Sequence, residues 1–378
     1  MQRISTPPRD RWRERLEGAG FGYHSGPDGP YWNETAYYAF EPSEIESIER
    51  ATAELWECCL EMVQLVIDRG LYHRFHIPEA FIPYIEKTWE EDHPSIYGRF
   101  DLAYRGGQIK LLEFNADTPT SLFEAGIVQW YWLQDVAPWS DQFNSIHEKL
   151  VGYLRSASSC FRPGLLHFAC VRHSLEDLTN TEYLRDCAQQ AGLDTRLLHV
   201  DDIGWDLERE LFVDPNEEPI RNLFKLYPWE WLSREPFHVY LLRNTNEMYW
   251  IEPAWKMILS NKAILALLWE RFPGHPNLLP ACLNGPPSPD YVRKPLLSRE
   301  GANVDVFQGG SLRVTTPGIY GAEGYVYQQY FELADLSGQH PILGSWVIGQ
   351  EPAGIGIRET EGLVTNDRSR FVPHLIRT

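Results

Sequence analysis

The residues best suited to chemistry gather in one stretch, RFDLAYRGGQIKLLEFNADTPTS, which runs from residue 99 to residue 121. Two strand-like runs flank a pair of glycines in it, and glycines between alternating runs are typical of a β-hairpin. The length of the turn decides which side chains share a face, because side chains alternate along a strand with a period of two. A two-residue turn would pair Asp101 with Leu112 and leave the acids Asp101 and Glu113 on opposite faces.

A three-residue turn, Gly106 to Gln108, gives a register that is better suited to a chemical role. It pairs Asp101 with Glu113 and Arg99 with Asn115, so that four polar side chains share one face. The other face then carries Phe100, Leu102, Tyr104, Leu112 and Phe114, interrupted only by Lys110. Because such a face can be buried, we predict the three-residue turn.

The predicted polar face has the composition of a metal and phosphate site. Directly opposed strand residues have Cβ atoms about 5 Å apart, and two carboxylates at that distance repel unless a cation lies between them. The oxygens of Asp101, Glu113 and Asn115 are hard ligands that suit Mg²⁺ shared with substrate phosphates. Arg99 beside them suits a phosphate oxygen. The alternative is a merely solvated face on which Arg99 and Asn115 screen the two acids.

The loop that leaves this face, ADTPTS, contains three hydroxyl side chains and a proline. Thr118, Thr120 and Ser121 suit the binding of a substrate carboxylate or peptide. The alternative for Ser121 is a role as the N-cap of the apolar helix predicted over residues 122–136.

A strand–helix–strand unit is predicted further along the chain, with strands at 165–171 and 195–200 and a helix at 181–191. Its first connecting loop contains Glu176 and Asp177 and follows the carboxyl end of a strand, where α/β folds place ligands. These acids suit an ammonium group. The alternative is that they complement the helix N-terminus.

The remaining candidate residues are dispersed. Ser43 and Glu46 form a predicted capping box for a long amphipathic helix that ends at Gly70, and residues 1–30 are predicted to be irregular. Isolated cations follow in or near predicted strands, helix starts and loops: Lys225, Lys262, Lys294, Arg299 and Arg358. Each alone is typical of a surface charge, but with the metal face they fit phosphoryl transfer, in which positioning and charge neutralisation supply most of the catalysis.

Composition narrows the possible functions. The 378 residues, 43% of them hydrophobic, indicate a globular protein of two or three lobes. A net charge of −19 argues against nucleic-acid binding and favours a cationic substrate if the acids cluster, although solubility alone would also account for it. The six cysteines include no CxxC pair, so neither a zinc site nor a disulfide framework is predicted. No leader and no apolar run of about 18 residues is present, which predicts a cytoplasmic protein without membrane contact.

Taken in order, the motifs resemble those of a known family, the synthetase domain of glutathionylspermidine synthase. The resemblance covers nearly the whole chain and rests on YWNETAYY, RFD with LEFNADTPTS, FKLYPWEW, EPAWKMILSNKAIL, YVRKPLLSREGANV and GSWVIGQEPAGIGIRE. It implies a mixed α/β (α+β) fold, ATP-grasp-like with permuted motif order because the metal ligands precede the lysines, plus a pre-ATP-grasp α/β domain. The tail with Arg358 is then expected to return to the hairpin.

The resemblance also implies a domain organisation. Residues 1–98 would form an N-terminal helical segment packed on the core, and 99–160 with 318–378 an ATP-grasp lobe carrying the metal site. Residues 161–254 would form the substrate domain, and 255–317 a small lobe covering the nucleotide.

Site roles follow from the same resemblance. Arg99 would contact the terminal phosphate, and Asp101, Glu113 and Asn115 would hold Mg²⁺. Thr118 and Thr120 match hydroxyl positions of the acyl-substrate site, where the family can carry serine. Glu176 and Asp177 match an acidic pair for the acyl substrate and polyamine, Asp177 being shorter than the expected glutamate. The nucleotide and phosphate residues would be Lys262 and Lys294, Gln328 and Gln329 at the adenine hinge, and Arg299 and Arg358.

The implied activity is ATP- and Mg²⁺-dependent ligation of a peptide-like, glutathione-like carboxylate to a polyamine-like amine through an acylphosphate. Bifunctional members carry an amidase domain before the synthetase, and this chain is too short to hold one, so hydrolysis of the conjugate is not predicted. We expect small-molecule substrates, no nucleic-acid or membrane partner, and a monomer or homodimer. The alternatives are a non-catalytic ATP- or polyamine-binding protein and a kinase-like phosphotransferase.

Overall fold

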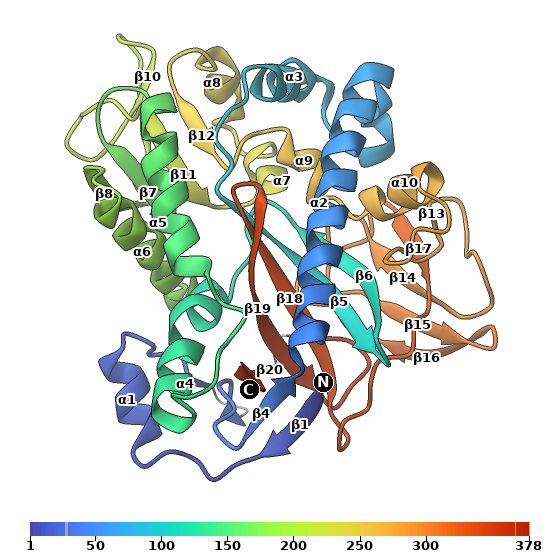
Figure 1. Cartoon of the computed structure of the whole chain (residues 1–378). Coiled ribbons are helices and arrows are strands. Elements are labelled where there is room, and N and C mark those ends of the chain that lie inside the picture. The colour runs from blue at the N-terminus through green and yellow to red at the C-terminus, as the bar shows by residue number, and fades with distance from the viewer. Residues whose placement is uncertain (27–28, 367, 378) are drawn as a thin grey trace.

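The computed structural model describes residues 1–26, 29–366 and 368–377. Its centre is a five-stranded antiparallel sheet in the order β20-β19-β18-β5-β6 (Figure 1). The strands are β5 (Tyr97–Arg105), β6 (Gln108–Asn115), β18 (His340–Ile348), β19 (Glu351–Thr360) and β20 (Arg370–Val372). The hairpin of the sequence analysis is therefore paired, through β18, with the last strands of the chain.

Helix α2 (Pro42–Arg69) runs along this sheet and buries its apolar side in the main core. The helix ends, as predicted, at Gly70, whose φ of 63° is in the left-handed region that favours glycine. The predicted capping box was wrong: Glu41 and Glu44 form it, and Pro42 takes the first helical position, where its fixed φ suits the helix start.

The N-terminal 30 residues are more ordered than predicted. Strand β1 (Gln2–Ser5) pairs with β4 (Ala36–Phe40), and β4 pairs in parallel with β21 (His374–Ile376), so both ends of the chain share one sheet. Arg3 fixes this sheet to β19 through two hydrogen bonds to Glu359, of 2.7 and 2.9 Å. Helix α1 (Trp12–Gly18) and the short strands β2 (Ser25–Gly26) and β3 (Gly29–Pro30) complete the segment. The irregular-start prediction was wrong because these polar residues are ordered by tertiary ion pairs rather than by a local pattern.

A four-stranded sheet is parallel, as predicted, with the order β12-β11-β7-β8. Its strands are β7 (Leu166–Cys170), β8 (Thr195–His199), β11 (Asn222–Leu226) and β12 (Tyr249–Ile251). Helix α6 (Leu175–Gln190) connects β7 to β8 and packs beside α5 (Ile146–Ala157). The helix begins six residues before the predicted position 181, because Ser174 caps it by accepting a hydrogen bond from the Asp177 amide at 3.1 Å.

A further five-stranded sheet, named here the small sheet because its strands are short, is antiparallel and faces the hairpin from the side of β6 (Figure 1). Its order is β13-β17-β14-β15-β16, formed by β13 (Ala281–Cys282), β14 (Tyr291–Pro295), β15 (Asp305–Gln308), β16 (Ser311–Thr315) and β17 (Tyr325–Gln329). Helix α10 (Ala263–Arg271) packs on it.

The remaining elements connect the sheets described above. They are α3 (Ile82–Glu90), a π-helical turn (Glu124–Val128), α4 (Gln129–Val136), α7 (Trp229–Leu232), α8 (His238–Arg243), α9 (Lys256–Leu259), the β9–β10 hairpin (Gly204–Asp206 and Leu211–Val213), and 3₁₀ turns at Leu71–Phe75, Glu79–Phe81, Ser158–Cys160 and Val200–Asp202. None of the helices in the described part of the chain has the length and apolar character needed to cross a membrane.

Candidate active site

The hairpin reaches the predicted pairing by a route that was not predicted. Asp101 pairs with Glu113 and Arg99 with Asn115, which confirms the register at the acids. The tip, however, is a two-residue Gly106-Gly107 turn, so the three-residue turn was wrong. A register shift beside Asp101 leaves Leu112 as an extra residue on β6, a β-bulge that returns the two acids to the same face.

The bulge also redistributes the apolar side chains. Leu112 and Lys110 were predicted on the buried face, and both lie elsewhere. Leu112 packs against Ala103 and Ile342 in a separate small cluster, and Lys110 donates a hydrogen bond to the carbonyl of Pro276 at 2.6 Å. The buried face of the hairpin consists instead of Phe100, Leu102, Tyr104, Ile109, Leu111 and Phe114.

Both acids of the polar face have cationic partners. Asp101 accepts hydrogen bonds from Arg99 Nε and Arg358 Nη2, each at 2.7 Å. Burial acts to raise the pKa of Asp101, but the two guanidinium groups outweigh it and hold that pKa below its ordinary value. Glu113 forms an ion pair with Lys262 Nζ at 3.0 Å. Each acid of this face is therefore held in ion pairs with cationic side chains, and the solvated face of the alternative is not observed.

Arg358 on β19 reaches Asp101 of the hairpin across strand β18. Strand β18 lies between β5 and β19, and Gly344 on β18 pairs directly with Asp101. A Cβ atom at this position would lie 2.8 Å from Arg99 Cδ. The missing side chain thus provides the space in which Arg99 lies beside Asp101, and the expected return of the tail to the hairpin is observed.

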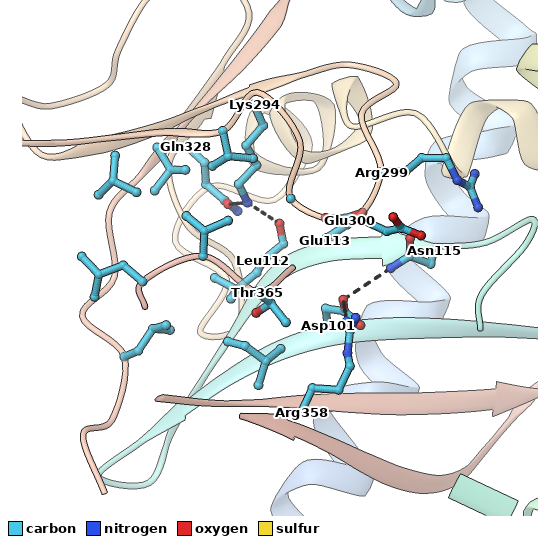
Figure 2. Close-up of a pocket in the computed structure, with 18 of the residues that line it drawn as sticks. Asp101, Leu112, Glu113, Asn115, Lys294, Arg299, Glu300, Gln328, Arg358 and Thr365 are labelled. Carbon is cyan, nitrogen blue, oxygen red and sulfur yellow. Dashed lines mark hydrogen bonds and ion pairs between the residues drawn. The ribbon is translucent and has the colours of Figure 1, made fainter. Parts of the chain in front are cut away.

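The bulge is also the point at which the small sheet contacts the hairpin. Lys294 on β14 donates to the carbonyl of Leu112 and to Gln328 Oε1, both at 2.7 Å (Figure 2). Gln328 on β17 in turn donates to the carbonyl of Leu111 at 2.9 Å. The Gln328 side chain is buried and engaged with Lys294, whereas Gln329 ends β17 beside the same cavity.

With ATP as the nucleotide that the family resemblance implies, we expect its KM to rise between about pH 7 and pH 9, because the Lys294 ammonium loses its proton in this range. Burial lowers the pKa of Lys294 to about 8; Lys262 acts in the same direction, and Glu113 and Asp101 oppose it. Initial rates measured against ATP concentration at several pH values would show this. Lys294→Arg should flatten the rise, since a guanidinium stays charged, and a wild-type KM that is constant over the range would contradict the prediction.

The loop ADTPTS is held by charged residues from three directions. Arg299 Nη2 donates to Thr118 Oγ1 at 2.6 Å, and Arg99 Nη1 donates to the Thr120 carbonyl at 2.6 Å. Asp117 is anchored to the parallel sheet through Lys225 Nζ, at 2.7 Å. The loop therefore has a fixed position between the polar face of the hairpin and the parallel sheet.

Asp117→Asn is expected to lower the free energy of unfolding by about 3–5 kcal/mol, because breaking a buried ion pair leaves a buried charge without a partner. Both side chains of the Lys225–Asp117 pair are at most 2% exposed. Urea unfolding followed by tryptophan fluorescence would measure the change. The matched control is Glu61→Gln, which breaks an exposed pair with Arg271 and should cost less than about 1 kcal/mol. Equal losses in the two variants would contradict the prediction.

Ser121 does not cap the helix that follows it. The amides of Leu122 and Phe123 donate instead to Asn180 Oδ1 on α6, at 2.9 and 3.2 Å. Ser121 has a φ of 67°, and its hydroxyl lies 3.2 Å from that of Tyr31. The N-cap alternative is therefore wrong, and Asn180 ties α6 to the helix that follows the ADTPTS loop.

Glu176 and Asp177 lie in the first turn of α6, not in a loop. This position fits the helix N-terminus alternative, since acids in a first turn complement the helix dipole. Burial raises the pKa of both carboxyls, and the hydroxyl of Thr120 partly offsets it at Glu176. Thr120 lines the cavity that also contains Arg99 and Asp101, so the first turn of α6 borders the candidate site as well.

One cavity joins most of the predicted site residues (Figure 2). Its polar end contains Arg99, Asp101, Glu113, Asn115, Thr118, Thr120, Arg299 and Arg358, and its other end contains Lys294, Gln328 and Gln329. Lys262 contacts it through Glu113. Apolar side chains also line the cavity, Val292, Val304, Val306, Leu333 and Ile342 among them. The arrangement suits a ligand with a flat apolar part and several negative charges.

Comparison of the sequence with known protein families identifies the family of the chain. The family model described as glutathionylspermidine synthase, pre-ATP-grasp, matches residues 3–377. The chain belongs to the glutathionylspermidine synthase family.

Relatives of this glutathionylspermidine synthase family member carry ligase names. A Haemophilus influenzae protein, provisionally named an acid–amine ligase, is 42% identical and covers 99% of both chains. Trypanothione synthetase of Crithidia fasciculata is 29% identical over 82% of this chain and 51% of its own length. The Escherichia coli bifunctional glutathionylspermidine synthetase/amidase is 26% identical over 90% of this chain and 59% of its own length. This chain thus spans between half and three-fifths of the last two relatives.

The fold is shared more widely than the sequence. A glutathione synthetase-like effector from Globodera pallida superposes with a TM-score of 0.58 at 8% identity, covering 90% of this chain and 89% of its own. The mixed α/β, ATP-grasp-like fold implied by the family resemblance is confirmed.

Two acids at or next to this site were missed by the sequence analysis. Glu300 lines the cavity (Figure 2). Glu230, on α7, forms a 3.4 Å ion pair with Arg299. Glu300 lies inside the family motif SREGAN, and Glu230 lies inside PWEW. The sequence around each acid does not indicate which residues lie beside it in space.

Proposed function

We propose that the chain is an ATP-dependent ligase that joins a peptide-like, glutathione-like carboxylate to a polyamine-like amine through an acylphosphate. The observation that carries the proposal is the pairing of Asp101 with Glu113 in one cavity with Arg99, Arg358 and Lys294. Opposed acids among phosphate-binding cations suit a triphosphate, whose transfer depends on charge neutralisation. The ligase names of the relatives support the same reaction class.

In this proposal the small sheet covers the nucleotide. Its apolar side chains contact the base, with Gln329 at the hinge, and Lys294 and Lys262 bind the phosphates. Gln328 holds Lys294 in place rather than meeting the base, because its side-chain oxygen and nitrogen are both engaged. Arg99, Arg299 and Arg358 would stabilise the phosphoryl group that is transferred.

The polar face fits Mg²⁺ that is shared with phosphate. In the described part of the chain no cluster of three or more His, Cys, Asp or Glu has the arrangement of a metal site. Asp101, Glu113 and the Asn115 amide offer hard oxygen ligands with room left for phosphate oxygens, which is how proteins usually hold Mg²⁺. The ion would neutralise phosphate charge. The depressed pKa of Asp101 keeps that carboxylate ionised near neutral pH.

The proposed reaction has two chemical steps, formation of the acylphosphate and formation of the amide. An oxygen of the acyl substrate's carboxylate, placed by Thr118 and Thr120, attacks the terminal phosphorus of ATP, and ADP leaves. The amine nitrogen then attacks the acyl carbon, inorganic phosphate leaves with the carboxylate oxygen, and the nitrogen loses a proton as the amide forms. Glu176 and Asp177 would attract the amine to this end of the cavity.

ADP release measured over a panel of small peptides and polyamines tests the proposal. A ligase requires both a peptide and an amine, a binding protein releases no ADP, and a phosphotransferase releases ADP without amine. Hydroxylamine in place of the amine should trap the acylphosphate as a hydroxamate that mass spectrometry identifies. ADP release that is independent of any amine or hydroxylamine would contradict the proposal.

A further inference from the structure

Glu300 is an acid in the cavity to which the proposed function gives no role. Among the described residues, three acids line the cavity: Asp101, Glu113 and Glu300 (Figure 2). Asp101 is paired with two arginines, and Glu113 is paired with Lys262. The side chain of Glu300 is exposed and forms no hydrogen bond or ion pair with another residue in the described part of the chain. Its carboxylate oxygens are therefore free to accept a proton.

The backbone around Glu300 is strained and firmly held. Glu300 has a φ of 51° and Asn303 a φ of 54°, both in the left-handed region that residues with a Cβ atom rarely adopt. The Thr316 hydroxyl donates to the Gly301 carbonyl at 2.5 Å. The Tyr320 amide donates to Asn303 Oδ1 at 2.7 Å. Strain that the surrounding contacts maintain in this way is typical of functional sites, and it gives the exposed Glu300 side chain a fixed point of attachment.

Glu300 lies close to the places proposed for both substrates of the ligase. Its neighbour in the chain, Arg299, donates to the hydroxyl of Thr118, which is proposed to place the acyl carboxylate. Burial raises the pKa of Glu176 and of Asp177, and the negative charge of Glu300 adds to both rises, so Glu300 is also near the first turn of α6. Those two acids are proposed to attract the amine. The free carboxylate is thus close to the groups that would place the acyl substrate and the amine.

The second step of the proposed reaction needs a proton acceptor. An amine nitrogen that has attacked the acyl carbon is positively charged, and it must lose a proton as the amide forms. A carboxylate held by a cation is a weaker base, because the cation favours its ionised form, so Asp101 and Glu113 are poorly suited to the task. Glu300 has no such partner among the described residues. A positioned general base typically contributes about 10²–10⁴-fold to a rate.

We propose that Glu300 is the general base of the amide-forming step. The lone pair of the free amine forms the C–N bond, and the carbonyl π pair moves onto oxygen. The Glu300 carboxylate then takes one proton from the nitrogen. The π bond re-forms as the bond between the acyl carbon and the phosphate oxygen breaks, and phosphate leaves with that electron pair. Phosphate takes the proton from Glu300, which restores the carboxylate. The proposal rests on the ligase function and assigns one residue of its second step.

Separate assays of the two steps test the proposal, with the peptide and alkylamine that release most ADP, starting from glutathione and spermidine. Hydroxylamine is a much weaker base than an alkylamine, so its adduct loses its proton to water without help. In Glu300→Gln, hydroxamate formation should stay within about twofold of wild type, whereas amide formation should fall at least about 100-fold. The control Glu332→Gln removes an exposed acid that lies outside the cavity lining and should leave both rates unchanged.

Glu300→Ala separates proton transfer from a structural role. This variant removes the carboxylate and leaves space for a small acid, so added formate should restore part of its amide formation and should not affect wild type. The KM for ATP and the Mg²⁺ requirement should match wild type in both Glu300 variants, since a metal ligand or a residue that only shapes the loop would change them. An equal fall in hydroxamate and amide formation, or a loss of amide formation that formate does not restore, would overturn the proposal.

The wild-type protein separates this inference from the ligase proposal. Hydroxamate formed by wild type, together with wild-type amide formation in Glu300→Gln, would retain the ligase and overturn the role of Glu300. Absence of hydroxamate and amide in wild type with every peptide would overturn the ligase proposal and the general base with it.

Discussion

Glu113→Gln is expected to abolish amine-dependent ADP release while leaving the fold intact. The substitution removes one of two opposed charges from the face proposed to hold Mg²⁺ and triphosphate. Loss of one such electrostatic partner typically costs about 3–4 kcal/mol of transition-state stabilisation, a fall of about 10²–10³-fold in kcat. The side chain is 26% exposed, and its partner Lys262 keeps a hydrogen bond to the Ser298 carbonyl. Coupled ADP assays and thermal melting would measure the two quantities.

Asp101→Asn should show the same loss of turnover with a larger loss of stability. Asp101 pairs with the buried guanidinium group of Arg99 and the partly exposed one of Arg358, and its neutralisation leaves both without this counter-charge. The control Glu332→Gln removes an exposed acid that pairs with Arg105 on the same hairpin, and it should leave both turnover and stability near wild type. Wild-type turnover in Glu113→Gln or Asp101→Asn would rule these residues out as metal ligands.

The hairpin shows how far a local pattern reaches. The alternation predicted that one face would be buried and that the acids would share the other, and both are observed. The turn length was wrong because a bulge has no signature in alternation: Leu111, Leu112 and Glu113 read as a continuous strand. What identifies the bulge is distant in sequence, since its carbonyls are bonded by Lys294 and Gln328 from another sheet.

Element ends that depend on long-range contacts were predicted poorly for the same reason. The helix after Ser121 is capped by Asn180, 58 residues away, and the N-terminal strand is ordered by Glu359, 356 residues away. Ends governed by local geometry fared better, as Gly70 shows.

The assembly of the site came from the family motifs rather than from periodicity. Neither charge nor spacing indicated that Arg358 would meet Asp101, 257 residues away. Glu300 lies inside a family motif but was not singled out, and its place at the site is recognised only once its spatial neighbours are known. The catalytic and binding roles remain predictions that the variants above test.

Gly301→Ala is expected to uncouple ADP release from amide formation. Gly301 has a φ of 69°, and a Cβ atom there would overlap the carbonyl oxygen of Thr365 and lie 2.9 Å from Val364 Cγ1. Gly301, Val364 and Thr365 all line the cavity (Figure 2 labels Thr365). Two loops far apart in sequence thus meet over the site, and a methyl group would force them apart. Water admitted there competes with the amine for the acylphosphate.

The ratio of ADP to amide should therefore rise well above one, with amide formation falling at least about tenfold, because exclusion of water and positioning of the amine are both impaired. Gly310→Ala is the matched control. Gly310 has a φ of 73° in the turn between β15 and β16, and a Cβ atom there would meet nothing within 4 Å beyond its chain neighbours, so it shares the backbone strain of about 1 kcal/mol without the collision. A ratio near one in Gly301→Ala would show that contact between the two loops is not what protects the intermediate, whereas uncoupling in both variants would assign the effect to strain alone.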